Sequence, residues 1–335
     1  MENKKYYTMK NIAIIGTSSA AITHIKSYDE MNDVNIKWIF SEDINRAEYF
    51  TKEFNIVNFT SNYNQILEDK EIDYIDICNI PEKHIAYAEK AIDSGKGLII
   101  EKPISHKFPY AKNFFNKYKD SQYPIMIVYQ YPYSETFKKL KEIIDSKKFG
   151  SLKSYFVRYH SKRDKKYYDK KWRTQKEYAG GGVLISQGIH FINLIFSYTG
   201  YTNMRLCAKT LNIVHKLNVE DTCLISILHD NGILGNFDFS TGLESNLEIC
   251  LYLQRACVTT KGGKVLIKTD VKRIIDTPTK GTFQMLVQNY FNKTEKIHNY
   301  KMNFYEALLD LGIIEQIYKS ASRGESIDFY INNLL

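Results

Sequence analysis

Two titratable residues, Lys102 and His190, lie at positions where a side chain could take part in catalysis. Lys102 lies in Glu101-Lys102-Pro103, directly after the apolar run Leu98–Ile100, and His190 begins an apolar helical pattern that follows the glycine run 180–182. A lysine ammonium can stabilise negative charge that develops on an oxygen, and a histidine exchanges protons near neutral pH without a large pKa shift. Taken alone, the two residues are more simply explained as a surface lysine and a helix-face histidine.

A turn that could hold a phosphate follows the first apolar run, Ile12–Ile15. The first glycine of a dinucleotide-binding fingerprint is present as Gly16, but Ser18 stands in the place of the second and Ala21 in the place of the third. The backbone of such a turn, together with the N-terminus of the next helix, binds a pyrophosphate. Its candidate cofactor-binding residues are Gly16, Thr17, Ser18, Ser19 and Ala20. A strand–helix turn without a ligand explains the same residues equally well.

The residues after the second apolar run bear on the type of dinucleotide. Ser41 occupies the position where an acid usually binds the ribose hydroxyls of NAD. A serine with a nearby cation such as Arg46 suits the 2′-phosphate of NADP, whereas Glu42 and Asp43 argue for NAD. The pattern therefore favours NADP only slightly, and a plain loop with a helix-capping residue fits as well.

Alternating elements position these residues in the first part of the chain. Short apolar runs alternate with amphipathic helical patterns up to about residue 129, which predicts a parallel sheet covered on both faces. Right-handed crossovers make this a doubly wound Rossmann domain, assigned to residues 1–127. The expected strands are Ile12–Ile15, Ile36–Phe40, Tyr74–Cys78, Leu98–Ile100 and Ile125–Tyr129, and the expected helices are Ala20–Met31, Ile44–Phe54, Ser61–Glu68, Ile85–Ser94 and Tyr110–Tyr118.

The remainder, residues 128–335, has a different pattern. Period-two alternation predicts a large open, mostly antiparallel sheet in an α+β domain. The expected strands are Leu152–Tyr159, Arg205–Leu211, Cys223–His229, Ile233–Ser240, Leu247–Gln254 and Val265–Lys268, and the expected helices are Ser134–Ser146, Ile189–Tyr198, Thr282–Phe291 and Asn303–Ser322. The fold class is therefore α/β with two domains.

Composition argues against several classes of binding partner and indicates the cellular compartment. The net charge of +8 comes mostly from lysines spread along the chain, which indicates a solvated surface more than a nucleic-acid site. No apolar run approaches the ~20 residues of a membrane helix, and the first ten residues do not form a secretory signal. Five scattered cysteines show no metal-ligand spacing. We expect a cytoplasmic protein without metal, nucleic-acid or membrane partners.

Two extended motifs stand out along the chain. The first runs from Asp76 to His84 and ends, after Gly95-Lys96, in Glu101-Lys102-Pro103. The second begins at Trp172-Arg173 and continues from Gly180 through Ser186-Gln187-Gly188 to His190. Together with Val219-Glu220-Asp221-Thr222 and the closing helix, these motifs resemble the glucose–fructose oxidoreductase, inositol dehydrogenase and rhizopine-catabolism (Gfo/Idh/MocA) family over almost the whole chain.

This resemblance implies an NAD(P)-dependent oxidoreductase that acts on a CH–OH group of a sugar, cyclitol or nucleotide sugar. It implies that Lys102, aimed by a cis peptide bond before Pro103, contacts the substrate hydroxyl beside the nicotinamide and that His190 is the acid/base. Ser186 stands where the family commonly has Asp or Asn, and a serine cannot carry charge. The further cofactor-binding residues implied are Ser41, Arg46, Asn79, Pro81, His84, Glu101 and Lys102.

The resemblance also implies which residues bind the substrate. A loop rich in cations and aromatic residues precedes the second motif, and such a loop suits a stacked base and phosphates, although a solvated lysine-rich loop fits it too. The candidate substrate-binding residues are Tyr131, Tyr168, Trp172, Arg173 and Gln187. An open sheet would expose a flat face, and members of the family form dimers or tetramers, so we expect a homodimer or homotetramer through this sheet. A non-catalytic cofactor- or sugar-binding regulatory protein on the same fold is the alternative, since Ser18 and Ser186 depart from the family pattern.

Overall fold

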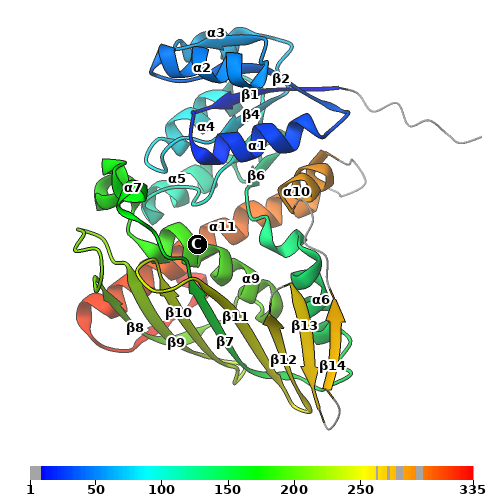
Figure 1. Cartoon of the computed structure of the whole chain (residues 1–335), viewed down its shortest axis with the longest axis vertical. Helices are drawn as coiled ribbons and strands as arrows, with labels where there is room; N and C mark the ends of the chain where they lie inside the picture. Colours follow the sequence, from blue (N-terminus) through cyan, green and yellow to red (C-terminus); the bar gives the residue numbers. More distant parts are fainter. Residues whose placement is uncertain (1–8, 262, 270–271, 277–281, 292–296, 335) are drawn as a thin grey trace, which may run out of the picture. The chain divides into compact units, whose positions relative to one another are not determined.

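The computed structural model describes residues 9–261, 263–269, 272–276, 282–291 and 297–334 (Figure 1). The chain divides into two compact units, which are treated separately. The first comprises Met1–Ser105, Asn113–Val128 and Phe283–Tyr305, and the second comprises His106–Lys112, Tyr129–Thr282 and Glu306–Leu335. The first unit is thus assembled from segments far apart in the sequence.

A six-stranded parallel sheet forms the first unit, with the strand order β3-β2-β1-β4-β5-β6. The order reverses between β1 and β4, which is where doubly wound sheets bind ligands at the carboxyl ends of their strands. The strands are β1 Lys10–Ile15, β2 Val34–Phe40, β3 Asn58–Thr60, β4 Tyr74–Ile77, β5 Gly97–Ile100 and β6 Ile125–Ile127. The helices between them are α1 Ser19–Asp29, α2 Ile44–Phe54, α3 Tyr63–Glu68, α4 His84–Asp93 and α5 Phe108–Tyr118, and α10 Thr282–Phe291 comes from later in the chain.

Local sequence explains these elements. The central strands are mostly apolar, and residues 12–15 and 98–100 are fully buried, as expected of strands covered on both faces. Side-chain oxygens of Ser18, Asp43 and Asn62 accept backbone N–H groups at the starts of α1, α2 and α3. The predicted Rossmann fold is confirmed. Strand β3 was not predicted, because three residues are too few for periodicity to identify.

The second unit is built on a nine-stranded sheet with the order β14-β13-β12-β11-β7-β10-β9-β8-β15. The pairing is antiparallel except between β7 and β10, which run parallel. The strands are β7 Leu152–His160, β8 Met204–Leu211, β9 Thr222–His229, β10 Leu234–Ser240, β11 Asn246–Leu253, β12 Ala256–Lys261, β13 Lys264–Lys268, β14 Lys272–Asp276 and β15 Ile327–Phe329. The mostly antiparallel sheet is as predicted, although β12, β14 and β15 were not foreseen.

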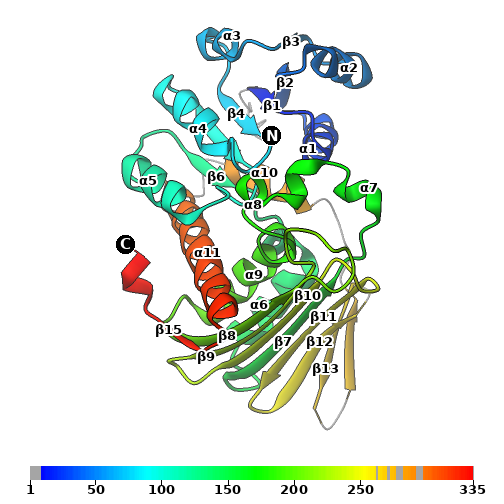
Figure 2. The same cartoon turned by 90° about the vertical axis from the view of Figure 1, so that its left-hand side faces the viewer.

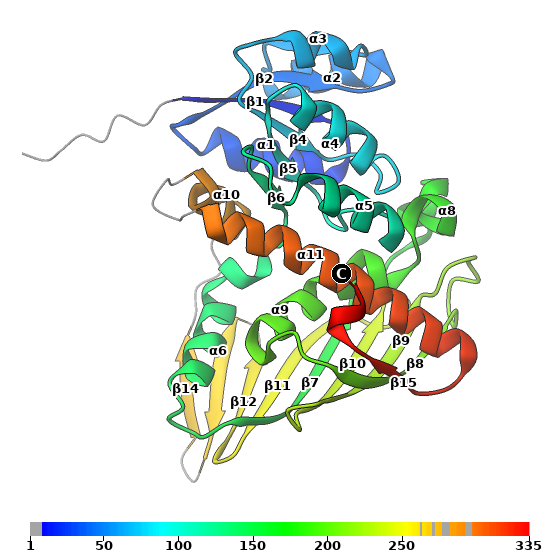
Figure 3. The same ribbon diagram turned by 180° about the vertical axis from the view of Figure 1, so that it is seen from behind.

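Helices α6 Glu135–Asp145 and α9 Ile189–Thr199 lie over one face of this sheet (Figures 2 and 3). Along β9, Ile225 and Ile227 are buried toward that face, whereas Leu224 and Leu228 are exposed on the other. Helix α9 is buried over residues 189–196, as expected of a helix apolar on all sides. Short helices α7 Lys165–Tyr168 and α8 Lys176–Ala179 interrupt the loop after β7, and α11 Ile297–Arg323 precedes the final strand.

One helical stretch in the described residues, Lys176–Thr199, is long and apolar enough by length and composition to cross a membrane. Its most apolar window is 83% buried inside the protein. Burial of this extent is typical of the core helix of a globular domain, and the stretch includes the π-helical turn Leu184–Gly188 that leads into α9.

Candidate active site

The turn between β1 and α1 requires a glycine at its first position. Gly16 has a φ of +113°, and a Cβ there would lie 2.9 Å from the backbone nitrogen of Asn79. Ser18 is the N-cap of α1, and its hydroxyl accepts the Ala21 N–H at 3.3 Å. The Ser18 side chain is therefore directed back to the helix start, which explains how the turn forms without the second glycine of the fingerprint.

Arg46 and Glu42 surround the end of β2, where the dinucleotide's ribose is expected. The Arg46 guanidinium donates to the Thr17 hydroxyl at 2.9 Å and to the Thr17 carbonyl at 2.7 Å. The Ser41 hydroxyl accepts the Asp43 N–H at 3.3 Å. Both oxygens of Glu42 lie 2.6 Å from the Lys83 ammonium, and this bond holds the Glu42 pKa below its usual range. Glu42 is thus neutralised by a partner within the same unit.

The loops after β4 and β5 face each other across His84. Its ring nitrogens lie 2.9 Å from the Pro103 carbonyl oxygen and 3.1 Å from the Asn79 carbonyl oxygen, and burial lowers its pKa. The peptide bond between Lys102 and Pro103 is cis, as expected from the sequence. His84 therefore connects the loop of Asn79 and Pro81 to the Glu-Lys-Pro segment.

The residues at the carboxyl ends of the parallel strands fit a dinucleotide. A glycine turn in the left-handed region leads into a capped helix N-terminus at the point where the strand order reverses. The Oδ1 atom of Asn79, at the carboxyl end of the β4 strand, is buried and accepts no hydrogen bond from the described residues. Gly16 to Ala20 would hold the pyrophosphate, and Ser41 with Arg46 would hold the ribose.

Glu101 is fixed by a histidine that sequence analysis did not place in the site. Its Oε1 lies 3.1 Å from Nε2 of His24, and its Oε2 accepts the Lys102 N–H at 3.1 Å. Burial would raise the Glu101 pKa, but the bond to His24 and the charges of His24 and Lys102 together outweigh burial, so the pKa is lowered. The carboxylate next to Lys102 is therefore ionised and held in place.

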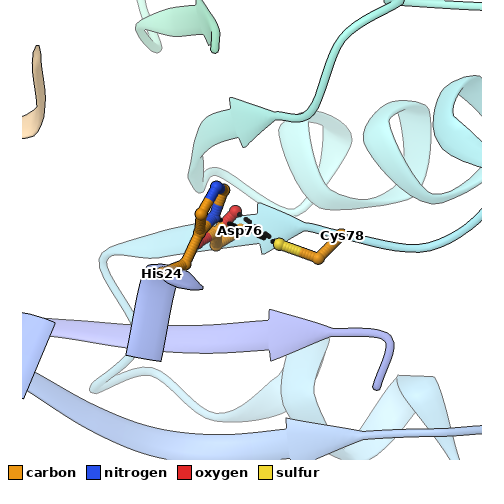
Figure 4. Close-up of side chains that lie close together, drawn as sticks. All are labelled: His24, Asp76 and Cys78. Carbon is orange, nitrogen blue, oxygen red and sulfur yellow. Dashed lines mark hydrogen bonds and ion pairs between the residues drawn. The ribbon is translucent and has the colours of Figure 1, made fainter. Parts of the chain in front are cut away.

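His24 belongs to a buried cluster with Asp76 and Cys78 (Figure 4). Its Nδ1 lies 2.9 Å from Oδ2 of Asp76 and 3.2 Å from Sγ of Cys78, and the Tyr28 hydroxyl donates to the same Asp76 oxygen at 2.8 Å. Burial favours neutral His24, yet the charges and hydrogen bonds of Asp76 and Cys78 together outweigh burial and raise the His24 pKa well above its usual value.

The donor types of this cluster are those of a metal site, but its protonation favours a hydrogen-bonded network. Burial raises the pKa of the Cys78 thiol, so the thiol stays protonated at neutral pH. The His24 imidazolium supplies a positive charge between the Asp76 and Glu101 carboxylates. Phe283 covers the ring, with centroids 3.8 Å apart. The cluster is best interpreted as an ion network that supports the carboxyl end of the sheet.

In the second unit, His190 lies on α9 beneath two tyrosines. Its ring stacks on Tyr131 with centroids 4.7 Å apart and meets the Tyr129 ring edge-on at 6.3 Å. His190 is only 5% exposed. Ser186 and Gln187 lie in the π-helical turn that immediately precedes α9. The structure thus brings predicted residues Tyr131 and His190 into contact.

A glutamate anchors the segment that carries these residues. The Glu220 carboxylate accepts the N–H groups of Gly182 at 2.9 Å and Leu184 at 3.1 Å, and the Tyr318 hydroxyl at 2.7 Å. A Cβ on Gly182 would overlap the Glu220 carbonyl oxygen. The sequence motif contained Glu220, but only the structure shows what this residue does.

The loop after β7 forms an aromatic and cationic cluster. The guanidinium groups of Arg163 and Arg173 lie 4.9 Å and 4.1 Å from the Tyr167 ring centroid, and that of Arg173 lies 4.9 Å from Trp172. Tyr168 belongs to the same cluster, because its ring meets Tyr167 edge-on with centroids 4.9 Å apart, and its hydroxyl donates to Thr241 at 2.7 Å. The structure therefore brings the predicted residues Tyr168, Trp172 and Arg173 together around Tyr167.

Comparison with known proteins agrees with this geometry. Residues 10–129 match the "Oxidoreductase family, NAD-binding Rossmann fold", and residues 137–259 match the "GFO/IDH/MocA C-terminal domain". The chain belongs to the Gfo/Idh/MocA family of oxidoreductases. Its first unit accordingly contains the family's NAD-binding Rossmann domain.

Individual members of the Gfo/Idh/MocA family are distant in sequence. An uncharacterized protein of Saccharomyces cerevisiae, YMR315W, is 26% identical over 264 residues, which is 74% of this chain and 73% of that protein. Levoglucosan dehydrogenase of Pseudarthrobacter phenanthrenivorans is 26% identical over 43% of this chain and 37% of its own. The match to several of these relatives thus spans half of their length or less.

Solved structures of the family share the whole fold. Levoglucosan dehydrogenase in complex with NADH and levoglucosan superposes with a TM-score of 0.85 at 18% identity, covering 96% of this chain and 99% of that one. An oxidoreductase from Agrobacterium radiobacter, in complex with NAD+, L-tartaric acid and magnesium, gives 0.85 at 17% identity, covering 98% and 100%. At these identities the likeness establishes the fold alone.

Proposed function

We propose that this protein is an NAD(P)-dependent oxidoreductase that transfers a hydride to or from a hydroxyl-bearing carbon of a sugar, cyclitol or nucleotide sugar. The observation that carries the proposal is His190, buried under Tyr131 on the segment anchored by Glu220, in a chain whose Glu-Lys-Pro motif ends a strand of an NAD-binding Rossmann domain. Residues 1–127 bind the cofactor, and residues 128–335 bind the substrate and a second copy of the chain.

Each residue of the proposed site has a defined task. The bound nicotinamide supplies the hydride acceptor or donor. Lys102 donates a hydrogen bond to the substrate oxygen and stabilises the negative charge that develops there. His190 removes the hydroxyl proton or returns it. Its stacking on Tyr131 fixes the ring plane, and Ser186 and Gln187 orient the substrate through neutral hydrogen bonds.

We further propose that the cofactor is NADP in preference to NAD. Arg46 places a guanidinium beside the turn at Thr17, near the Ser41 position that follows β2. The Glu42 carboxylate would repel a 2′-phosphate, but it is neutralised by Lys83 and bonded to the Tyr87 hydroxyl at 2.9 Å. Titration with NADPH and NADH, followed by nicotinamide fluorescence, compares the two cofactors. Arg46→Gln should weaken NADPH binding about tenfold, or ~1.4 kcal/mol, and leave NADH binding unchanged.

The oxidoreductase activity is tested with Lys102→Met and His190→Asn. Both variants should bind the cofactor as wild type does, and each should reduce sugar-dependent turnover at least ~100-fold. Lys119→Met, which changes an exposed lysine of the first unit, controls for the loss of one positive charge. Cofactor binding without turnover of any sugar, and without an effect of Lys102→Met, would favour the regulatory alternative.

We also propose that the protein self-associates through the outer face of the nine-stranded sheet. Leu224, Leu228, Leu234 and Tyr252 are 50%, 46%, 53% and 45% exposed, and the pairing of Leu234 with Leu228 places these two side by side on that face. Such an apolar surface is typical of an interface. Sedimentation should give a dimer or tetramer for wild type and a monomer for Leu228→Lys/Leu234→Lys.

A cytoplasmic location is part of the same proposal. All five cysteines are free, and Cys207 is exposed. An exposed free thiol is typical of a reducing compartment. Fractionation of the source cells, followed by detection of the protein with an antibody, tests the location.

A further inference from the structure

Arg163 follows β7 and has an unsatisfied side chain. Its backbone N–H donates to the Thr241 carbonyl at 2.9 Å, while its guanidinium lies over the Tyr167 ring. The Nε atom is buried and has no hydrogen-bond partner among the described residues. Every other arginine side chain that the structure describes bonds or pairs with a carboxylate, carbonyl or hydroxyl of the chain. Arg163 is therefore the exception among them.

A buried N–H donor without a partner is unfavourable, because it has lost its hydrogen bond to water and gained none in return. Arg163 as a whole is partly exposed, and it is its Nε atom that is buried in this way. Within the described residues Arg163 forms no ion pair, and the neighbouring Asp164 carboxylate already accepts the Tyr167 N–H at 3.0 Å as the cap of α7. An acceptor for Nε must therefore come from outside the described residues.

The surroundings of Arg163 connect it to the proposed acid/base. Burial raises the pKa of Tyr131 and of Tyr168, and the positive charge of Arg163 acts on both phenols in the opposite direction. The charge of Arg163 thus acts on Tyr131, and Tyr131 in turn stacks on His190 with ring centroids 4.7 Å apart.

The charge balance of this region favours an anion. A second guanidinium, that of Arg173, also lies over Tyr167 and donates to the Tyr167 carbonyl at 3.2 Å. A planar guanidinium binds carboxylate and phosphate oxygens through paired hydrogen bonds. A neutral sugar would offer these two guanidinium groups hydroxyl oxygens but no negative charge.

We propose that Arg163 binds an anionic group of the substrate, so that the substrate is a sugar that carries a carboxylate or a phosphate. That the bound anion belongs to a substrate rests on the proposed oxidoreductase function, but the anion site is defined by Arg163 itself. Carboxylate and phosphate share the same oxyanion chemistry. The guanidinium binds the anion, while His190 exchanges the hydroxyl proton.

The first experiment measures anion binding without turnover. Protein saturated with NADPH, so that the cofactor's own phosphate site is filled, is titrated by calorimetry with inorganic phosphate and with malonate at constant ionic strength. Wild type should bind at least one of the two anions with a Kd of about 10 mM or tighter. Lys166→Gln, which neutralises an exposed lysine of the same loop, should bind it equally well. Arg163→Gln should bind at least ~10-fold more weakly, which corresponds to ~1.4 kcal/mol. Equal binding by wild type and Arg163→Gln, or no binding by wild type, would overturn the anion site.

The second experiment separates carboxylate from phosphate and tests the link to catalysis. Glucose, glucuronate and glucose 6-phosphate are compared as substrates, with a nucleotide sugar as a larger phosphate ester. A charged member should have the higher kcat/KM, and Arg163→Gln should remove that advantage mainly through KM. A neutral sugar preferred by wild type, or a ratio unchanged in Arg163→Gln, would contradict the proposal. If phosphate and malonate binding depends on Arg163 but no sugar is turned over, the anion site stands and the oxidoreductase proposal fails.

Discussion

The Glu220 carboxylate holds the backbone N–H of Gly182 at 2.9 Å, and the Glu220 carbonyl oxygen occupies the space where a Cβ of residue 182 would be. Gly182 therefore has to be a glycine for reasons of packing. The π-helical turn with Ser186 begins two residues later and leads directly to His190. The contact between Glu220 and Gly182 thus fixes the start of the segment that carries the proposed acid/base.

Gly182→Ala should damage both stability and activity. The added methyl group must displace the Glu220 backbone or the helix start, and overpacking of this kind typically costs about 1–3 kcal/mol. We expect that loss in the free energy of unfolding by urea, together with a lower kcat. Gly232→Ala is the control for kcat, because nothing lies within 4 Å of its Cβ position and at a φ of +82° its variant carries only a backbone cost of about 1–2 kcal/mol. A Gly182→Ala variant with wild-type kcat would show that this contact does not position the site.

Asp310 predicts an unusual pH dependence of stability. It is fully buried on α11, where it accepts the Tyr201 hydroxyl at 2.8 Å and the Asn193 amide at 2.9 Å. Burial raises its pKa to about 8. Because the folded state binds this proton more tightly than the unfolded state, the contribution of Asp310 is complete below the unfolded pKa, near ~4. It is lost as the pH rises through about 8.

Asp310→Asn isolates this contribution. The substituted side chain keeps a hydrogen-bonding amide that does not ionise, so the variant should gain stability relative to wild type as the pH rises from about 5 to 8. A single group of this kind changes the free energy of unfolding by at most ~1.4 kcal/mol per pH unit. Urea denaturation at several pH values measures the difference. Glu306, whose pKa burial raises to about 7, contributes in the same direction and remains in both proteins. Parallel pH curves for wild type and the variant would refute the prediction.

Much of the fold could be predicted, because its signals are local. The apolar strands Ile12–Ile15 and Leu98–Ile100 and the helix Ile44–Phe54 are set by patterning and capping that the sequence displays directly. The strands β12, β14 and β15 were not foreseen, because a short strand at or near a sheet edge is defined by its partner rather than by its own pattern. That residues 283–305 belong to the first unit is a long-range property that no local pattern carries.

The candidate site was predictable to a lesser degree. Lys102 and His190 stood out because both lie in extended motifs, and motif recognition needs no coordinates. His24 and Arg163 could not be assigned in this way. The role of His24 depends on its contact with Glu101, 77 residues further along the chain, and that of Arg163 depends on what its side chain lacks. Which side chains have hydrogen-bond partners, and which have none, can be seen only in a three-dimensional structure.

The network of His24 predicts a large loss of stability in His24→Gln. The variant would leave the Asp76 and Glu101 carboxylates in the core without their shared cation. Removing one member of a buried pair typically costs about 3–5 kcal/mol. His24→Gln/Asp76→Asn removes opposite charges together and should therefore be more stable than His24→Gln alone. Urea denaturation of the three proteins at neutral pH makes the comparison.

The same network has a defined pH dependence. The His24 pKa is raised in the folded state, because Asp76 and Cys78 together outweigh burial. Its stabilising effect is thus complete below the unfolded pKa, near ~6.5, and is lost as the pH rises through the higher folded value. The difference in stability between wild type and His24→Gln should shrink toward alkaline pH. A difference that grows with pH would mean that His24 is neutral in the folded protein.

Gly16→Ala tests whether the first turn binds the cofactor. Residue 16 has a φ of +113°, and a Cβ there would press on the backbone of Asn79 at 2.9 Å, so the variant must shift the turn that precedes α1. We expect cofactor affinity to fall at least ~10-fold, or ~1.4 kcal/mol.

Gly200→Ala provides the control, because Gly200 also has a positive φ, +79°, but lies in the second unit with open space around its Cβ position. Both variants pay the backbone cost of an alanine in the left-handed region, about 1–2 kcal/mol, whereas only Gly16→Ala disturbs the phosphate turn. Fluorescence titration with NADPH should therefore separate the two variants even if urea denaturation does not. If Gly16→Ala binds NADPH as tightly as Gly200→Ala does, the pyrophosphate is held elsewhere, and the assignment of Gly16 to Ala20 as cofactor-binding residues falls.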